Sequence, residues 1–554
     1  MRFSPALRAI LSRHHGLARL PRRCLVEGLE SRDLLSAVLG QPIGNLVFAQ
    51  DSGAESADLA QIFFDTNGQS DLSFTATSSN PSVLSASMSG STITLTPEPG
   101  RSGFAIIRAT AAAPDGSAAS NSFRVQITAS ASRTLHVSLG PSRKLFSFAA
   151  SNQASAIVTL KGPGTADVQM GGDALKLDGT SLHGVNQELE SITLSGTTAA
   201  SSLLITGHGT SRFALNIGNI SSDGPLGTLQ VKGATLLGDV SVPAGIHKLN
   251  VDSANSGSID AGSSPTSVQG ISFVDENFSS TGAVHSLMLG QWVDSDAVPE
   301  TFSAASVGRL TTRGSFQPGV QITGELGAAR IGGSIGGTWN VGRAATPISV
   351  GGNVAANFSG TFGALPGLTA KGDFGGSLTA PSIRSLRVAS MTSATLNLTA
   401  ASTTDLGVLT VARSVGFSSI LTAGSIGKVT AGQLSNCRVF AGVSSPSLPA
   451  TPSDFSSAAT IGSITLRPSR GETISFDSAR IAATSLGVLS LGTTRTGNGG
   501  FQYGVAAASI GRLTVKDTTH PQTIKLTAVH DAATLTSQLS AQKAQLGDLT
   551  FQIV

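Results

Sequence analysis

The sequence predicts an all-β protein in which a β-sandwich is followed by a parallel β-helix (β-solenoid) of roughly 20-residue coils. Three observations support this fold class. Gly is abundant (65 of 554 residues), while charged residues (12%) and aromatic residues (5%) are sparse. Short apolar runs rich in Val, Ile, Leu and Thr, which favour strands, alternate with turn residues along the chain. Beyond residue 185, one six-residue motif recurs at a period near 20 residues, which is typical of a solenoid.

The motif reads apolar, usually Gly, any residue, apolar, any residue, apolar. Gly is expected at the second position because a Cβ would be crowded at a coil corner, and the fourth and sixth side chains share one face of a strand. These side chains should stack on their equivalents one coil away and fill a narrow apolar lumen. Clear copies begin at Leu226, Val307, Leu406, Ile426, Ile461, Leu486, Ile510 and Leu546, and weaker ones at Leu189, Ile246, Val268, Val284, Leu326, Ala345, Leu365 and Ile383.

The spacing of the copies predicts the size of the rod. Successive starts from 226 to 426 lie 16 to 23 residues apart, whereas the gaps from 426 to 461 and from 510 to 546 are near 35 residues. We interpret each long gap either as two periods with a degenerate copy or as an insertion. At about 4.8 Å per coil, about 18–20 coils predict a rod roughly 90 Å long. A propeller is the alternative, since two coils would mimic one blade of about 40 residues.

Composition and strand spacing divide the chain into a basic leader (1–37), a β-sandwich (38–130), first coils or a transition (131–185) and the solenoid (186–554). Seven short strands between residues 45 and 127, separated by Gly, Pro, Asn and Asp, fit the sandwich. Seven Arg against three acidic residues give the leader a charge of +4, so the remainder carries −1 of the total +3. No broad basic surface is therefore expected for nucleic acid.

The leader carries the pattern Arg22-Arg23-Cys24-Leu25-Val26-Glu27-Gly28-Leu29-Glu30-Ser31-Arg32-Asp33-Leu34-Leu35-Ser36-Ala37. It resembles the N-terminal sorting motif of planctomycete and related exported proteins, approximately basic–LE-x-LE-x-R-x-LLS, with Val26-Glu27 in place of the first Leu-Glu. The resemblance implies export to the cell envelope, the cell surface or the exterior. The leader lacks the apolar run of a standard secretory signal and is too short and polar to span a bilayer. An ordinary amphipathic helix is the alternative interpretation.

The string from Phe64 to Phe74, followed by Ser79-Asn80-Pro81-Ser82-Val83, resembles bacterial cadherin-like (dystroglycan-type) and Ig-like modules over about residues 40–130. Such modules often bind calcium through clustered acids. The resemblance implies calcium at Asp65, Asn67 and Asp71, which are what remains of the acidic pattern. Calcium takes about six to eight oxygen ligands, so an ordinary Asx turn at these residues is the competing interpretation.

An enzyme of the β-helix type would need carboxylates that converge on one face. The best candidates are Asp239 and Asp260, which are 21 residues apart, with Asp223, Asp252, Asp275 and Glu276 nearby. Solvated turn aspartates are the simpler interpretation. Trp292 and Trp339 could stack on a sugar, although packing is the more ordinary role. No metalloprotease, serine-hydrolase or P-loop motif occurs, and Cys24 and Cys437 are too few for a Cys-based zinc site.

The sequence thus predicts an exported cell-surface structural or adhesive protein without catalytic activity. Its expected partner is a surface ligand, polysaccharide or protein, and neither nucleic-acid binding nor a transmembrane segment is expected. A carbohydrate-active β-helix (lyase or hydrolase type) and a calcium-dependent adhesion module are the alternative functions.

Overall fold

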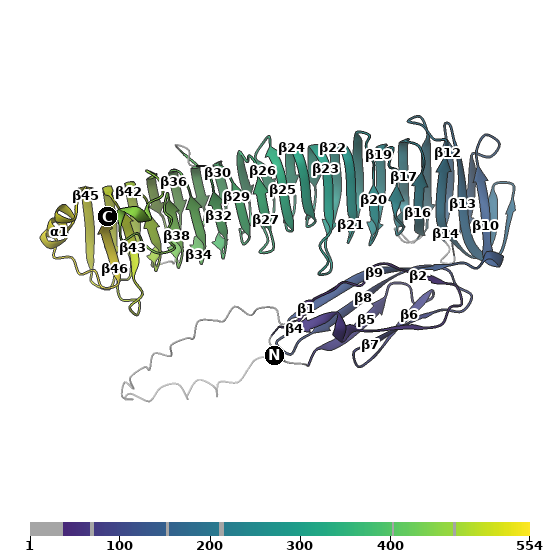
Figure 1. Cartoon of the computed structure of the whole chain (residues 1–554), viewed down its shortest axis with the longest axis horizontal. Helices are drawn as coiled ribbons and strands as arrows, with labels where there is room; N and C mark the ends of the chain where they lie inside the picture. The colour runs from purple at the N-terminus through teal and green to yellow at the C-terminus, as the bar shows by residue number, and fades with distance from the viewer. Residues whose placement is uncertain (1–36, 67–70, 151–153, 210–214, 401–403, 469–472) are drawn as a thin grey trace, which may run out of the picture.

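The computed structural model describes residues 37–66, 71–150, 154–209, 215–400, 404–468 and 473–554. The sorting motif, apart from Ala37, and Asn67 lie outside the described residues. The chain is all-β, with 62% strand and 4% helix. Figure 1 shows a long rod of stacked strands with a smaller β-module lying along one side of it.

The module comprises two sheets that share one apolar core, and a short pair of strands. The first sheet has the order β2-β9-β8-β5 and the second β3-β7-β6, while β1 pairs with β4. Alternating burial along β8 turns one face of the strand toward the core, as period-2 apolar patterning requires, whereas residues 123–127 of β9 are buried on both faces. The bounds are β1 (Ala37–Leu39), β2 (Leu46–Ala49), β3 (Glu55–Asp58), β4 (Phe63–Asp65), β5 (Ser73–Ser78), β6 (Leu84–Ser89), β7 (Thr92–Pro97), β8 (Gly103–Ala112) and β9 (Ala118–Thr128).

A cap with largely antiparallel pairing joins the module to the solenoid. Strand β13 pairs antiparallel with both β10 and β14, and β12 does so with β11 and β15. Residues 131–185 are therefore a transition rather than first coils. The bounds are β10 (Thr134–Leu139), β11 (Leu145–Ala149), β12 (Ser155–Lys161), β13 (Thr165–Asp178), β14 (Ser181–Ser195) and β15 (Ser202–His208).

The solenoid makes about 15 turns from about residue 215, fewer than the predicted 18–20. Its strands pair in parallel with their equivalents one coil away, and the motif stays in register: Leu406 lies opposite Ile426, Ile426 opposite Ile461, and Ile461 opposite Leu486. Motif-bearing strands are β17 (Leu226–Leu236), β19 (Ile246–Asn255), β21 (Thr266–Val274), β22 (Asn277–Val293), β23 (Thr301–Thr312), β24 (Gly319–Ile331), β30 (Ile383–Val388), β33 (Leu406–Val411), β36 (Ile426–Ala431), β39 (Thr460–Leu466), β42 (Ser485–Thr494) and β44 (Ser509–Asp517).

Gly at the second position of the motif is explained by the close stacking of coils. A Cβ at Gly427 would lie 2.5 Å from the Gly407 carbonyl oxygen, and one at Gly462 would lie 2.6 Å from the Gly427 carbonyl oxygen. Neither residue has a positive φ. The motif thus requires Gly because the preceding coil approaches closely, not because the backbone is left-handed.

Three assignments of motif copies are wrong. The copy at Leu189 belongs to a different strand stack, because Ile192 lies opposite Ile220, whereas Leu203 of β15 lies opposite Leu229 of the copy at Leu226. Val268 lies opposite Leu249, the fourth position of its neighbour, so the first position of that coil is Thr266, opposite Val284. The copy at Leu546 is not a coil equivalent of Ile510, because β46 (Leu549–Ile553) pairs with β43 (Tyr503–Ala507) instead of β44. The errors at Val268 and Leu546 changed the apparent period, but they left the alternation of apolar and polar residues along the strands unchanged.

The long gap after Ile426 is one coil with an insertion, since Ile426 and Ile461 are direct neighbours. After Ile510, strand β44 turns back into antiparallel β45 (Gln522–Val529), and α1 (Ala532–Ala541) contacts β45. The predicted start of the solenoid at residue 186 is also wrong, because antiparallel pairing extends through β15 and the solenoid begins at about residue 215. These three features account for the smaller number of turns. Helix α1 lies at the end of the rod (Figure 1), and its Leu535 side chain is buried.

Both tryptophans lie in the lumen. Trp292 and Trp339 are fully buried, and Phe316 packs edge-on against both of them, with ring centroids 5.6 and 5.9 Å away. Their indole N–H groups donate to the carbonyl oxygens of Glu276 and Gly336. They are packing residues and are not placed to stack on a sugar.

Candidate metal centre at the module–solenoid junction

Strand β9 lies along the side of the solenoid and makes contacts with successive coils (Figure 1). The chain direction of β9 runs against the order of the coils. Residues at the C-terminal end of β9 therefore contact the N-terminal end of the rod, and residues near its N-terminal end contact later coils. Ala129 to Ser120 would span about 30 Å as a strand, and the segments that they contact, from Glu190 to Asp296, lie about five coil steps apart, a rise of about 24 Å. The contacts along this junction are Ala129 N to Glu190 Oε1 (2.7 Å), Asn219 Nδ2 to Gln126 Oε1 (3.4 Å), Arg124 Nη2 to Asp239 Oδ2 (2.9 Å), Ser122 N to Asp296 Oδ2, and Ala297 N to Ser120 O (3.0 Å).

Arg124 is the central ion-pairing residue of the junction. Its side chain is only 7% exposed, it pairs with Asp239, and it also donates to the Leu237 carbonyl oxygen. Asp239 accepts from the backbone N and the hydroxyl of Ser258, both at 3.0 Å. Burial alone would raise the pKa of Asp239, but the hydrogen bonds and charge of Arg124 hold that pKa below its usual value.

Two buried glutamates stand at the early end of the junction. Burial is the main reason that the pKa of Glu188 rises to about 8, and the nearby carboxylate of Glu190 adds to this shift. Burial also raises the pKa of Glu190, although Ala129 N and Gln169 Nε2 donate to its two carboxylate oxygens. The module therefore covers carboxyls that would otherwise face water.

The other end of the junction holds the acidic cluster, defined here as Asp275, Asp294, Asp296 and Glu300. One carboxylate oxygen from each lies within 4.8 Å of those of the other three. Asp275 lies between β21 and β22, and the other three lie on the acidic loop (294–300) between β22 and β23. Coil stacking brings the two segments together, because Val274 lies opposite Val293.

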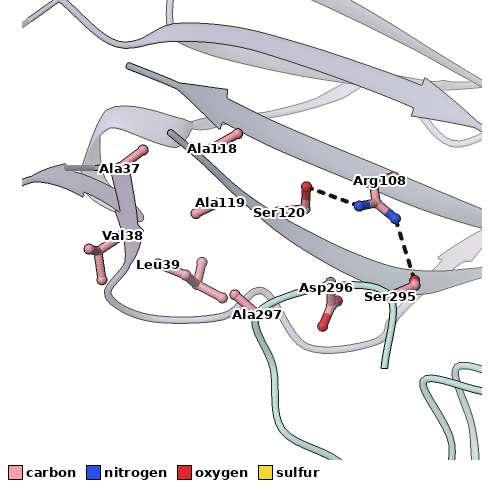
Figure 2. A pocket seen from close by; sticks show the side chains of 10 residues that line it. All are labelled: Ala37, Val38, Leu39, Arg108, Ala118, Ala119, Ser120, Ser295, Asp296 and Ala297. Carbon is pink, nitrogen blue, oxygen red and sulfur yellow. Dashed lines mark hydrogen bonds between the residues drawn. The ribbon is translucent and has the colours of Figure 1, made fainter. Parts of the chain in front are cut away.

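Hydrogen bonds fix the shape of the acidic loop. Asp275 accepts from the Ser295 backbone N (2.6 Å) and hydroxyl (2.5 Å), and Asp296 Oδ1 accepts from Val298 N (2.8 Å). Arg108 of the module donates to the hydroxyls of Ser120 and Ser295, as Figure 2 shows beside Asp296. The loop thus links the solenoid to β8 and β9 of the module.

The electrostatics of the cluster disfavour four negative charges. Burial, followed by repulsion from Asp294, Asp275 and Asp296, raises the pKa of Glu300 to about 9. Burial also raises the pKa of Asp294 to about 6 and raises the pKa of Asp296. Within the described part of the chain, no Lys, Arg or His forms an ion pair with any of the four carboxyls. Burial and mutual repulsion thus oppose ionisation of Glu300.

The sequence-predicted residues have different outcomes. Asp65 ends β4 opposite Ala37, Asp71 is exposed, and neither belongs to a group of three close metal-ligating side chains in the described ranges. Calcium binding at Asp65, Asn67 and Asp71 therefore stays a prediction. The pair proposed for catalysis is not stacked: Asp239 precedes Val240, which lies opposite Ile259, whereas Asp260 lies opposite Ser241.

The remaining acids proposed near that pair are dispersed. Asp223 accepts from Gly196 N and Asp252 from Gly233 N, so each carboxylate bonds to the backbone of a stacked neighbouring segment. Glu276 is fully buried: its Oε2 accepts from Gly257 N (3.0 Å), its Oε1 is unpartnered, and burial raises its pKa well above the usual value. Of this group, only Asp275 joins the acidic cluster.

Sequence reasoning missed Asp294, Asp296 and Glu300. A pattern was available, because Asp294-Ser-Asp296-Ala-Val-Pro-Glu300 begins 19 residues after Asp275, close to one coil period. The loop also falls within one of the two longest gaps between the motif copies from 226 to 426, the gap from 284 to 307. An acid-rich insertion one period after another acid predicts convergence in a solenoid.

The fold and this junction define the chain as an all-β protein with a β-solenoid that carries a docked β-module. Comparisons with protein-family models, with curated proteins and with solved structures find no match to this chain. None of the helices in the described ranges is long and apolar enough to cross a membrane.

Proposed function

We propose that this chain is an exported structural or adhesive protein of the cell surface, without catalytic activity, and that its module is an Ig/cadherin-like sandwich. In this proposal the solenoid is a rigid spacer, and the module is docked along its side. The leader's resemblance to an exported-protein sorting motif supports the location. The ligand expected at the surface is a polysaccharide or a protein.

The observation that carries the proposal is the use made of the solenoid's acidic residues. Asp239, the best catalytic candidate, is engaged by Arg124 and Ser258. The strongly perturbed carboxyls Glu188 and Glu300 are buried at the module–solenoid junction. Some outward-facing strand positions elsewhere are small and polar, such as Ser377 and Thr379 of β29 (Ser377–Ala380). These features support adhesion or spacing over chemistry.

A binding and turnover experiment on the full chain tests the proposal. The chain is incubated with polyuronates, glucans and xylans, and both retention on the insoluble polymer and release of reducing ends or unsaturated uronates are measured. Retention without product release is the expected result. Product release that disappears in Asp260→Asn would overturn the proposal and favour the carbohydrate-active alternative.

Surface location is tested separately in the source cells. Antibody labelling of intact cells should detect the chain, and cells expressing a form with Leu29, Leu34 and Leu35 replaced by Ala should retain it inside. Equal labelling of both forms would refute the role given to the leader motif, and an absence of labelling of the unaltered chain would refute export.

A further inference from the structure

We propose that Asp275, Asp294, Asp296 and Glu300 bind one Ca²⁺ ion, and that this ion fixes the acidic loop on which the module docks. The site is independent of the surface function proposed above. It also differs from the calcium site that the sequence suggested at Asp65, Asn67 and Asp71. The geometry of the cluster, the buried and unpartnered oxygen of Glu300 and the contacts of the loop support this site.

The geometry suits one large, hard cation. All four ligands are carboxylates, which are the oxygen donors that Ca²⁺ prefers, and no His or Cys belongs to the group. Since Ca–O bonds are about 2.3–2.6 Å long, two oxygens on opposite sides of the ion lie up to about 5 Å apart. The 4.8 Å limit on the separations in the cluster agrees with this span.

Glu300 supplies a second, independent observation. Its side chain is only 4% exposed, it reaches into the cluster, and its Oε2 atom has no hydrogen-bond partner. A buried oxygen without a partner costs free energy that a bound cation would recover. Glu300 and Asp275 also line a cavity of about 190 Å³, together with Asn45 and Asn121 of the module.

The loop that carries three of the ligands also makes contacts with the module. Asp296 accepts from Ser122 N, and Ala297 N donates to Ser120 O. An ion that holds Asp294, Asp296 and Glu300 together fixes the backbone between them. Calcium binding should therefore stabilise the docking of β9 at this end of the junction.

Calcium titration of the full chain is the direct test. Isothermal titration after chelation should give one Ca²⁺ per chain, and Asp294→Asn with Glu300→Gln should weaken binding by at least about tenfold. Mg²⁺ should bind more weakly, because it demands closer octahedral ligands. Asp65→Asn with Asp71→Asn is the matched control and should bind as the unaltered chain does.

The outcomes separate the possible explanations. No heat at millimolar Ca²⁺ would overturn the site. Loss of binding in the Asp65/Asp71 control alone would place the ion in the module instead. Mg²⁺ binding as tight as that of Ca²⁺ would overturn the choice of ion. A circular dichroism spectrum unchanged by the Asp294/Glu300 substitutions establishes that their effect is not unfolding.

Terbium luminescence locates the ion, because Tb³⁺ replaces Ca²⁺ and is excited by nearby tryptophan. Trp292 is two residues from Asp294, and its indole bonds to the carbonyl of Glu276, whereas Trp339 lies two coils further along. Trp292→Phe should remove most of the sensitised emission, and Trp339→Phe should retain most of it. The reverse order, or equal losses, would refute the location.

Hydrogen exchange measures the structural effect on the junction. Calcium should slow exchange of the backbone amides of Ser122 and Ala297, which donate hydrogen bonds across the junction. The β6–β7 hairpin, remote from the junction, is the internal control and should not change. Unchanged exchange at Ser122 and Ala297 with calcium bound would refute the docking role.

Discussion

Replacing Gly427 with Ala tests the stacking that defines the solenoid. A Cβ at this position would lie 2.5 Å from the Gly407 carbonyl oxygen, whereas ordinary contacts of this kind are 3.4–4 Å. The two coils must therefore move apart by roughly 1 Å or tilt, a distortion that costs about 1–3 kcal/mol in a packed interior. The strain should spread to the neighbouring coil at Gly462, whose own Cβ position faces the Gly427 carbonyl oxygen.

Gly416→Ala is the matched control in the same part of the rod. The nearest atom to a Cβ there is the Ser435 carbonyl oxygen at 4.0 Å, and Gly416 has no positive φ. Alanine meets open space at this position and restricts the unfolded chain. The control should therefore be neutral or stabilised by about 0.4–1 kcal/mol.

Scanning calorimetry on the full chain compares the two variants. With an unfolding entropy of about 2.1 cal/mol/K per residue, the roughly 340 residues of the solenoid and its end cap contribute about 0.7 kcal/mol/K. Gly427→Ala should then lower the melting temperature by about 1.5–4 °C, and Gly416→Ala should leave it equal or slightly raised. Equal melting temperatures of the two variants would refute the argument from coil contact.

Three further predictions concern the junction and the end cap. Arg124→Ala should destabilise docking of the module by about 2–3 kcal/mol. This is less than the full cost of breaking a buried ion pair, because the Asp239 side chain is 44% exposed. Backbone amides of β9 should exchange hydrogen faster in the variant, and unchanged exchange would contradict the prediction. Glu188 has its folded-state pKa raised from 4.5 to about 8, so the stability it contributes is full below pH 4.5 and is lost as the pH rises toward 8. Between these pH values, the free energy of unfolding of the unaltered chain, measured by urea titration, should therefore fall by about 3–5 kcal/mol relative to that of Glu188→Gln. If the unfolding free energies of the two chains changed in parallel with pH, the raised pKa of Glu188 would be refuted. Tyr503→Phe removes a hydroxyl that forms hydrogen bonds with the Thr494 hydroxyl (2.6 Å) and the Arg495 carbonyl oxygen (2.9 Å). The free energy of unfolding, measured by chemical denaturation, should fall by about 1–2 kcal/mol. A stability equal to that of the unaltered chain would refute the contribution of these hydrogen bonds.

Much of the solenoid could be predicted because its repeat is local. The motif places Leu406, Ile426 and Ile461 at the first position of successive coils, and the structure pairs them as expected. The register failed at Val268 because apolar residues alternate with a period of two, so a shift by two positions keeps every side chain on its face. Only the pairing with Leu249 distinguishes the two registers.

The acidic cluster was harder to predict because its members are not part of the repeat. Asp275 was noticed as one acid among several, while Asp294, Asp296 and Glu300 lie in an insertion that the motif does not describe. The spacing from Asp275 to Asp294 would have placed both on adjacent coils. Their burial, and hence the raised pKa of Glu300, could not be inferred from that spacing.

The sequence by itself determined the all-β class, the coil period and the apolar lumen, because each of these follows from residues within one or two coils. The motif glycines, expected at coil corners, lie inside strands instead, as Gly427 does in β36. The tertiary structure alone decided which side of the rod is covered. Arg124 and Asp239 are 115 residues apart, and no local pattern links them. The outer surface of a solenoid repeats from coil to coil, so only the docking of β9 distinguishes the buried carboxyls of the junction from solvated ones.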